Sequence, residues 1–211
     1  MGNEWLDIYD DQGNLMGQAL REETHQKGYW HRTFHCWLYE LRDGIPYVFF
    51  QRRQQGKDTN PLYYDITVAG HLTAGEQPQD AVREIEEEIG ILVQFEQLQE
   101  IMVVKEDARG ELNGKPYWDR EISHVFVLNN PEPVTAWKLQ AEEVMAVYAA
   151  PLEQLMQLFS EQAASITVNG YAFQDDEHML PDQQVITSSH FVPRASTYYL
   201  QVLNSIKQLT T

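Results

Sequence analysis

The segment of residues 70–91, GHLTAGEQPQDAVREIEEEIGI, constrains the fold more than any other part of the chain. Pro78 suits the first turn of a helix, and Gly90 suits the position just after a helix ends. The helix between them carries three glutamates at i, i+3 and i+4, which share one face: Glu84, Glu87 and Glu88. The segment therefore predicts a loop that leads into a short helix with an acidic face.

An apolar stripe lies beside the glutamates. Val82, Ile85 and Ile89 recur at helical spacing and are suited to pack against a sheet, and Asp80 precedes the glutamates by one turn. Clustered carboxylates repel one another unless a cation neutralises them, and oxygen ligands suit magnesium or manganese. The glutamates alone leave two interpretations open, a metal site and a solvated acidic face.

The composition is that of a globular, cytoplasmic domain. The 211 residues are 43% hydrophobic and long enough to bury a core, which favours a single domain of residues 1–211. No apolar run approaches the roughly 18 residues of a membrane span, and the acidic start, MGNEWLDIYDDQ, does not resemble a signal peptide. A single cysteine, Cys36, excludes an internal disulfide and a cysteine-based zinc site.

The charge balance limits the partners. The formal charge is −17, from 15 basic and 32 acidic residues. Such a surface repels nucleic acid polymers and anionic membranes, which argues against both as partners. An anionic small molecule binds such a chain only where local cations or a bound metal reverse the field.

Turn signals divide the remaining chain into strands and a few helices. Residues 6–10 and 17–21 flank the turn DDQGN and predict an N-terminal hairpin within residues 4–25. Further strands are expected at residues 34–40, 47–53, 101–105, 121–128 and 144–150, with a long polar loop at 106–118. A helix starting with Pro151, a loop-rich stretch and an amphipathic helix at residues 196–209 predict a C-terminal helical extension over residues 151–211.

Residues 70–91 resemble the Nudix box, Gly-x5-Glu-x7-Arg-Glu-U-x-Glu-Glu-x-Gly-U, in which U is a bulky apolar residue. The matching positions are Gly70, Glu76, Arg83, Glu84, Ile85, Glu87, Glu88, Gly90 and Ile91. Only six residues separate Glu76 from Arg83, which in a regular helix displaces Glu76 by about 100° and 1.5 Å, so we assign it no role. The resemblance implies an α+β Nudix fold, with a mixed β-sheet sandwiched between α-helices.

The resemblance also implies an activity, metal-dependent hydrolysis of a diphosphate linked to another group. Glu84, Glu87 and Glu88 would hold Mg²⁺ or Mn²⁺, and Arg83 would orient them. Glu84 or Glu87 is a candidate base, so the catalytic set is Glu84, Glu87 and Arg83. Glu143 is a weaker candidate for the base, against the alternative of an exposed acidic residue before a strand.

A second constellation resembles type I isopentenyl-diphosphate isomerase, which shares the Nudix fold. The stretches THQKGYWHRTFHCWLYE, QRRQQGK, AGH and WDREISHVFV match it in order and spacing. In that enzyme three histidines and two acidic residues bind a divalent metal; the matching positions here are His25, His31, His71, Asp119 and Glu121, where Asp119 replaces a glutamate. One ion can be shared only if the histidines lie within about 6 Å of one another. The diphosphate contacts would fall on Arg21, Arg53 and Lys57.

Two features separate this chain from the isomerase. Ala69 occupies the position of the isomerase's catalytic cysteine, and all three glutamates of the Nudix helix are intact. We therefore expect a hydrolase of the isomerase-like branch, acting on a nucleoside-diphosphate-type or other organic diphosphate. An isomerase-like enzyme acting on prenyl diphosphates and a catalytically silent ligand-sensing domain are the alternatives. The expected partner is the small-molecule substrate, and a homodimer stays open.

Overall fold

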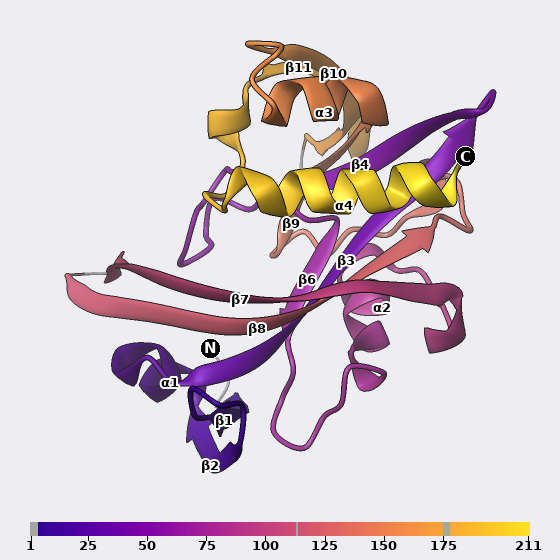
Figure 1. Ribbon diagram of the computed structural model, residues 1–211. Coiled ribbons are helices and arrows are strands. Elements are labelled where there is room, and N and C mark those ends of the chain that lie inside the picture. The colour runs from indigo at the N-terminus through magenta and orange to yellow at the C-terminus, as the bar shows by residue number, and fades with distance from the viewer. Residues whose placement is uncertain (1–3, 113, 175–177) are drawn as a thin grey trace.

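The computed structural model describes residues 4–112, 114–174 and 178–211, which form a mixed sheet with helices on both faces (Figure 1). The path through the sheet is β11-β10-β9-β4-β3-β1-β2, with β5, β6 and the pair β7–β8 attached to its central strands. The predicted α+β architecture is confirmed.

Strand β3, Trp30–Arg42, is the centre of the sheet. Its last residues pair antiparallel with β4, Ile45–Arg53, and its middle pairs antiparallel with β6, Val68–His71. Along most of its length β3 also runs parallel to β8, Lys115–Asn129. The short β5, Tyr64–Asp65, pairs with β4. Strand β3 thereby joins β4, β6 and β8, which are far apart in the sequence.

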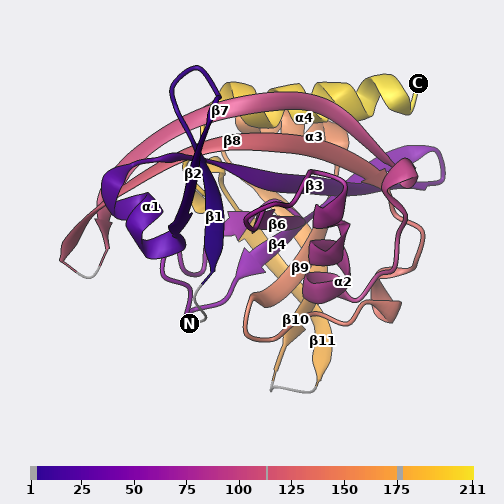
Figure 2. The same ribbon diagram turned by 90° about the horizontal axis from the view of Figure 1, so that it is seen from below.

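The predicted N-terminal hairpin is confirmed. β1, Trp5–Tyr9, pairs with β2, Leu15–Leu20, and helix α1, Arg21–Lys27, follows directly. Figure 2 shows α1 and this hairpin at the opposite end of the sheet from β10 and β11. Helix α1 ends at Gly28 in a left-handed conformation, where a Cβ atom would lie 2.2 Å from the Trp118 ring. Glycine therefore lets α1 pack closely against β8.

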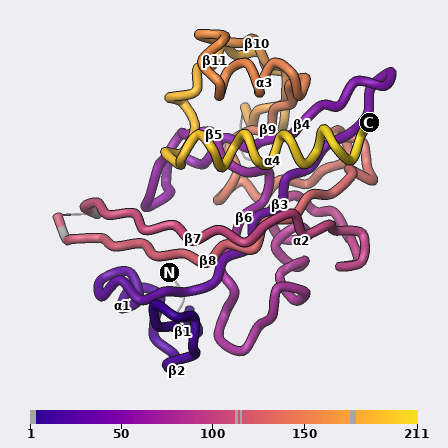
Figure 3. The backbone as a smooth tube through the Cα atoms, in the orientation of Figure 1, coloured from indigo at the N-terminus to yellow at the C-terminus, as the bar shows by residue number. Residues whose placement is uncertain are grey.

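The prediction of a polar loop at residues 106–118 is wrong. β7, Leu98–Leu112, and β8 form a long antiparallel hairpin in which Ala108 pairs with Asp119. The tube in Figure 3 shows this hairpin projecting beyond the sheet, beside α1. Its projecting part is rich in charged residues, and cations there stack on aromatic rings: Arg109 Cζ lies 4.0 Å from the centre of the Trp118 ring. The strands therefore lack the apolar alternation that would have predicted them.

The prediction of a loop-rich stretch before the last helix is also wrong. β10, Ile166–Phe173, and β11, Met179–Ile186, form a hairpin, and β10 continues the sheet by pairing with β9, Val144–Pro151. Helix α3, Leu152–Phe159, has Pro151 as its N-cap instead of its first residue. Helix α4, Ser196–Leu209, has the predicted bounds. Within the described residues, no helix is long and apolar enough to cross a membrane.

The sheet separates two hydrophobic cores, because alternate residues of a strand point to opposite faces. Val48 and Phe50 of β4 pack with residues of α3 and α4 on one face. Phe49 packs on the other face with Ile85 and Ile89 of helix α2, Arg83–Ile89. Burying each isoleucine contributes roughly 1.5–3 kcal/mol, and it fixes the rotation of α2 about its axis.

Candidate active site

A polar cleft of about 730 Å³ brings together most of the predicted site residues. Its walls come from α2, β3, β4, β6, the β7–β8 hairpin and the segment before α4. The predicted residues that line it are Arg21, Arg53, Lys57, His71, Glu84, Glu87, Glu88, Asp119, Glu121 and Glu143. Two groups of candidate cation ligands face this cleft, one on α2 and one around the histidines.

Helix α2 directs its glutamates into the cleft because its isoleucines are buried on the other side. The Glu84 carboxylate lies against Gly70, where a Cβ atom would come within 2.3 Å of the carboxylate carbon, so only glycine leaves room for it. Burial raises the pKa of Glu84 to about 7, and burial together with the charge of Glu84 raises the pKa of Glu88 to about 8. Glu87 is 55% exposed. A bound cation would relieve this repulsion between carboxylates.

Arg83 holds the acidic residues in place. Its Nε donates to Glu76 at 2.7 Å, and its Nη1 lies 2.7 Å from Glu84 and 3.3 Å from Glu87. Our omission of Glu76 is therefore corrected: it pairs with Arg83 and also accepts the Thr73 backbone N–H at 2.7 Å. The expected displacement assumed a regular helix, whereas a 3₁₀ turn, Asp80–Val82, precedes α2.

Asp80 does not take part in the cation site. Its carboxylate accepts the Gln77 backbone N–H at 2.8 Å and so closes the turn before the helix. Among the acidic residues of this segment, Glu84, Glu87 and Glu88 line the cleft, whereas Glu86, the fourth glutamate of α2, is exposed outside it.

The three histidines converge, although they come from α1, β3 and β6. One ring nitrogen from each of His25, His31 and His71 lies within 4.8 Å of the others, which satisfies the distance limit for a shared ion. Asp119 Oδ1 lies 3.4 Å from His25 Nε2 and 3.5 Å from His31 Nε2. His31, Asp119 and Glu121 form a second, overlapping group within the same limit.

The donor atoms of this cluster suit a divalent cation. Four buried atoms of the cluster have no hydrogen-bond partner among the described residues: His25 Nε2, His31 Nε2, His71 Nε2 and Asp119 Oδ1. Leaving such atoms without a partner is costly, so their convergence points to a ligand. Three imidazoles and one carboxylate match the number and type of ligands that zinc takes. Of the expected residues, these four and Glu121 would hold the ion.

Burial also keeps the imidazoles in the ligating form. It lowers the pKa of His31 to about 4 and the pKa of His71 well below its usual value. The Nδ1–H of neutral His31 donates to the Tyr29 carbonyl at 3.2 Å, which leaves the lone pair of Nε2 directed into the cluster. The Tyr117 hydroxyl donates to Asp119 at 2.9 Å and fixes that carboxylate.

The three predicted phosphate-binding cations line the cleft, and each pairs with a carboxylate. Arg21 lies 3.1 Å from Glu4, and Arg53 lies 2.9 Å from Asp65. Lys57 pairs with Glu143, which places the weaker candidate base inside the cleft. These pairs hold the cations beside the cleft. The pairs occupy only some of the N–H donors of Arg53 and Lys57, so other donors remain for a ligand.

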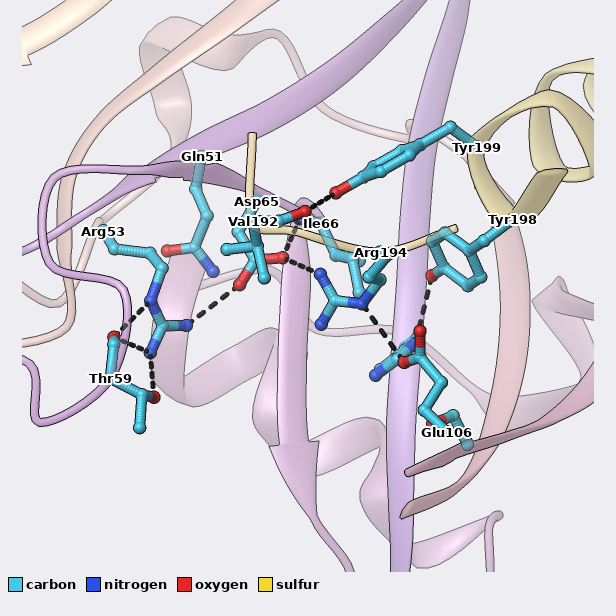
Figure 4. Close-up of polar contacts among 12 residues, drawn as sticks. Gln51, Arg53, Thr59, Asp65, Ile66, Glu106, Val192, Arg194, Tyr198 and Tyr199 are labelled. Carbon is cyan, nitrogen blue, oxygen red and sulfur yellow. Dashed lines mark hydrogen bonds and ion pairs between the residues drawn. The ribbon is translucent and has the colours of Figure 1, made fainter. Parts of the chain in front are cut away.

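The segment before α4 also lines the cleft, which the sequence did not predict. The Arg194 side chain is 11% exposed and donates to Asp65 at 2.7 Å and to Glu106 at 3.3 Å, while Arg53 binds the other oxygen of Asp65 (Figure 4). No local pattern predicts Arg194, since its partners lie far away in the sequence. His35 was also missed, although a signal exists: it shares a strand face with His31 and Thr33.

Comparisons with known proteins agree on one family. The model of that family, described as NUDIX domain, matches residues 29–168. An uncharacterized Nudix hydrolase of Clostridium acetobutylicum is 32% identical over 206 residues, which are 98% of each chain. Nudix hydrolase 3 of Arabidopsis thaliana is 30% identical over 166 residues, which are 77% of this chain and 21% of that protein.

Solved structures share the fold. A crystal structure from Deinococcus radiodurans has a TM-score of 0.52 at 18% identity and covers 75% of this chain and 90% of that one. A MutT/nudix family protein from Enterococcus faecalis has a TM-score of 0.52 at 12% identity and covers 84% of this chain and 62% of that one. At these identities the two structures support the fold alone.

Proposed function

This chain belongs to the NUDIX domain family and is a Nudix-type pyrophosphohydrolase, and we propose that it hydrolyses a nucleoside-diphosphate-type or other organic diphosphate with Mg²⁺ or Mn²⁺ bound by Glu84, Glu87 and Glu88. The observation that carries this proposal is the arrangement of α2. Its three carboxylates face one polar cleft and Arg83 contacts two of them, with repulsion that a cation would relieve.

The residues of α2 have different roles in the proposed reaction. When bound, a divalent cation polarises phosphoryl oxygens and lowers the pKa of the attacking water. Glu84 and Glu88 are fixed by Arg83 and by Gln51, whose amide donates to Glu88 at 3.1 Å. Glu87, the most exposed of the three, lies 3.3 Å from Arg83 and would accept the proton of the water through an oxygen that the cation leaves uncoordinated. Glu84 is the alternative base.

We propose that Arg21, Arg53 and Lys57 bind the diphosphate oxygens. They supply local positive charge in a chain of net charge −17, and they line the same cleft as the glutamates. Arg53 is preorganised, since Asp65 and the Thr59 carbonyl orient its guanidinium.

We further propose that His25, His31, His71, Asp119 and Glu121 hold a second divalent metal. Imidazole nitrogens together with carboxylate oxygens suit zinc, manganese or iron better than magnesium. Ala69, beside His71 on β6, supplies no thiol for proton transfer to carbon, so this second ion would serve substrate binding or architecture.

The histidine cluster is the observation that favours a second candidate function, isomerisation of a prenyl diphosphate. The ligand atoms of the cluster lie close enough together to share one ion. However, Ala69 lies in the cleft where isomerisation needs a proton donor and acceptor. A silent ligand-sensing domain is the third candidate, and the complete carboxylate set on α2 argues against it.

The decisive experiment is a hydrolysis screen with nucleotide sugars, dinucleotides, nucleoside triphosphates and prenyl diphosphates, each with Mg²⁺, Mn²⁺ or a chelator. We expect turnover of at least one class that depends on the cation. Binding of a class without turnover under any cation would favour the ligand-sensing domain.

A further inference from the structure

The C-terminal helix α4 reaches His35, a neighbour of the histidine cluster in the wall of the cleft, through one side chain. Tyr198 is fully buried, and its hydroxyl lies 3.0 Å from His35 Nδ1. His35 lines the cleft on the same face of β3 as His31. α4 lies outside the segment matched by the family, so this contact adds a residue to the site from a part of the chain with no motif.

The direction of the hydrogen bonds at Tyr198 follows from Trp37. The Trp37 indole N–H, which is only a donor, donates to the Tyr198 oxygen at 3.1 Å. The hydroxyl proton of Tyr198 therefore remains for His35 Nδ1. An imidazole that accepts a hydrogen bond at Nδ1 carries its proton on Nε2, so this contact sets the tautomer of His35.

The protonated nitrogen of His35 faces Glu121. The distance from His35 Nε2 to Glu121 Oε2 is 3.9 Å, longer than a hydrogen bond, so the Nε2–H of a neutral imidazole faces this carboxylate as a dipole and not as an ion pair. The Ser123 hydroxyl approaches the same oxygen at 3.5 Å, and the Thr33 hydroxyl in turn donates to Ser123 at 2.9 Å. Both donors act on Oε2, which leaves Oε1 of Glu121 outside these contacts.

We propose that Tyr198 is a positioning residue of the histidine cation site: it fixes the tautomer of His35, whose Nε2–H then orients the Glu121 carboxylate toward the cation. The proposal rests on the second metal of the proposed function. Partners that orient metal ligands in this way change metal affinity by roughly 10–100-fold when they are removed.

The path of the chain before α4 holds Tyr198 in place. Arg194 binds Asp65 and Glu106, and the Tyr199 hydroxyl donates to the Val192 carbonyl at 2.6 Å (Figure 4). The Arg194 contacts anchor the segment that leads to Tyr198. Tyr199 provides a matched control, because it is an adjacent tyrosine whose hydroxyl donates to the Val192 carbonyl of its own segment and not to His35.

The test begins with the tautomer in the metal-free protein. Nitrogen-15 NMR of the histidine rings, with His35→Asn used for assignment, reports which nitrogen carries the proton. We expect the wild-type chain to carry it on Nε2 of His35, Tyr198→Phe to give a mixture, and Tyr199→Phe to resemble wild type. A proton on Nδ1 in wild type, or an unchanged His35 in Tyr198→Phe, would overturn the proposal.

The second measurement is a Co²⁺ titration followed by visible absorption, which reports nitrogen ligands. We expect Tyr198→Phe and His35→Asn to weaken Co²⁺ binding roughly tenfold, and Tyr199→Phe to bind as wild type does. No Co²⁺ binding in wild type, unchanged affinity in Tyr198→Phe, or equal losses in both tyrosine variants would refute it. Hydrolysis with Mg²⁺ is assayed separately. The His35 tautomer and the Co²⁺ affinity can therefore be interpreted even if the protein does not hydrolyse any diphosphate tested.

Discussion

The two candidate cation sites share one cleft but are built in opposite ways. The glutamates of α2 come from one helix and already have protein partners, Arg83 and Gln51. The histidine cluster takes residues from α1, β3, β6 and β8, and four of its donor atoms have no hydrogen-bond partner among the described residues. The first site is set by local structure, and the second by the whole fold.

Because the two sites are built differently, we expect them to exchange a bound cation at different rates. A half-exposed carboxylate such as Glu87 can exchange ligands with solvent and substrate, as turnover requires. His31 is fully buried, and a cation bound there would be held tightly and exchanged slowly. We therefore propose that an exchanging, reactive cation would bind at α2 and a resident cation at the histidines.

The largest expected effect is on turnover. We predict that Glu87→Gln lowers turnover at least about a hundredfold with the fold intact, as expected when a positioned ligand or base is lost. Steady-state kinetics on the best substrate measures it. Glu86→Gln, on the exposed side of the same helix, is the control and should behave like wild type. Near-normal activity of folded Glu87→Gln would reject the assignment of α2.

The next effect is on cation binding. We predict that His71→Asn weakens Co²⁺ binding to the histidine cluster at least about tenfold, because one ligand is lost. Hydrolysis with Mg²⁺ should fall less than in Glu87→Gln. His124→Asn is the control, since His124 pairs with Glu100 away from the cleft. If both histidine variants bind Co²⁺ as wild type does, the cluster is no cation site.

A smaller effect concerns stability and pH. In the metal-free chain the pKa of Glu88 is about 8, against 4.5 in the unfolded chain. Between these two pH values the folded state keeps a proton on Glu88 that the unfolded state has released. The resulting stabilisation of the folded state is complete below pH 4.5. It is lost as the pH rises toward 8. Wild type should lose up to about 1.4 kcal/mol per pH unit relative to Glu88→Gln.

Urea denaturation of the metal-free proteins at pH 5, 6, 7 and 8 measures this difference. Histidines contribute to the pH dependence of both proteins, so only the difference between them isolates Glu88. Added Mg²⁺ should flatten the wild-type dependence. Parallel curves for wild type and Glu88→Gln would show that Glu88 ionises normally.

The last prediction is that one reaction, isomerisation, does not occur. We predict that isopentenyl diphosphate is not isomerised, because Ala69 has no acidic proton to exchange. Deuterium incorporation from heavy water into this substrate is the measurement. Exchange at a rate comparable to that of a true isomerase, in carefully purified protein, would favour the isomerase-like alternative instead.

The sequence predicted the parts of the molecule that depend on local spacing. The face of α2, the Gly90 cap and the bounds of α4 all follow from periodicity and terminal residues. The sequence predicted the inner parts of β7 and β8, at residues 101–105 and 121–128, but missed their projecting parts at 106–118, where exposed charged residues replace the apolar alternation. Arg194 was beyond local reasoning, since its partner Asp65 is 129 residues away. The scattered histidines were grouped only through a resemblance to another family.

The parallel pairing of β3 with β8 has a consequence for how the molecule is made. It joins positions 90 residues apart, such as Thr33 and Ser123, so a long loop must close before these strands gain any contact. During synthesis α2 emerges well before β8, and Tyr198 emerges later still. The acidic helix is therefore made before its cleft can form, and the histidine pocket can close only after β8 has been synthesised.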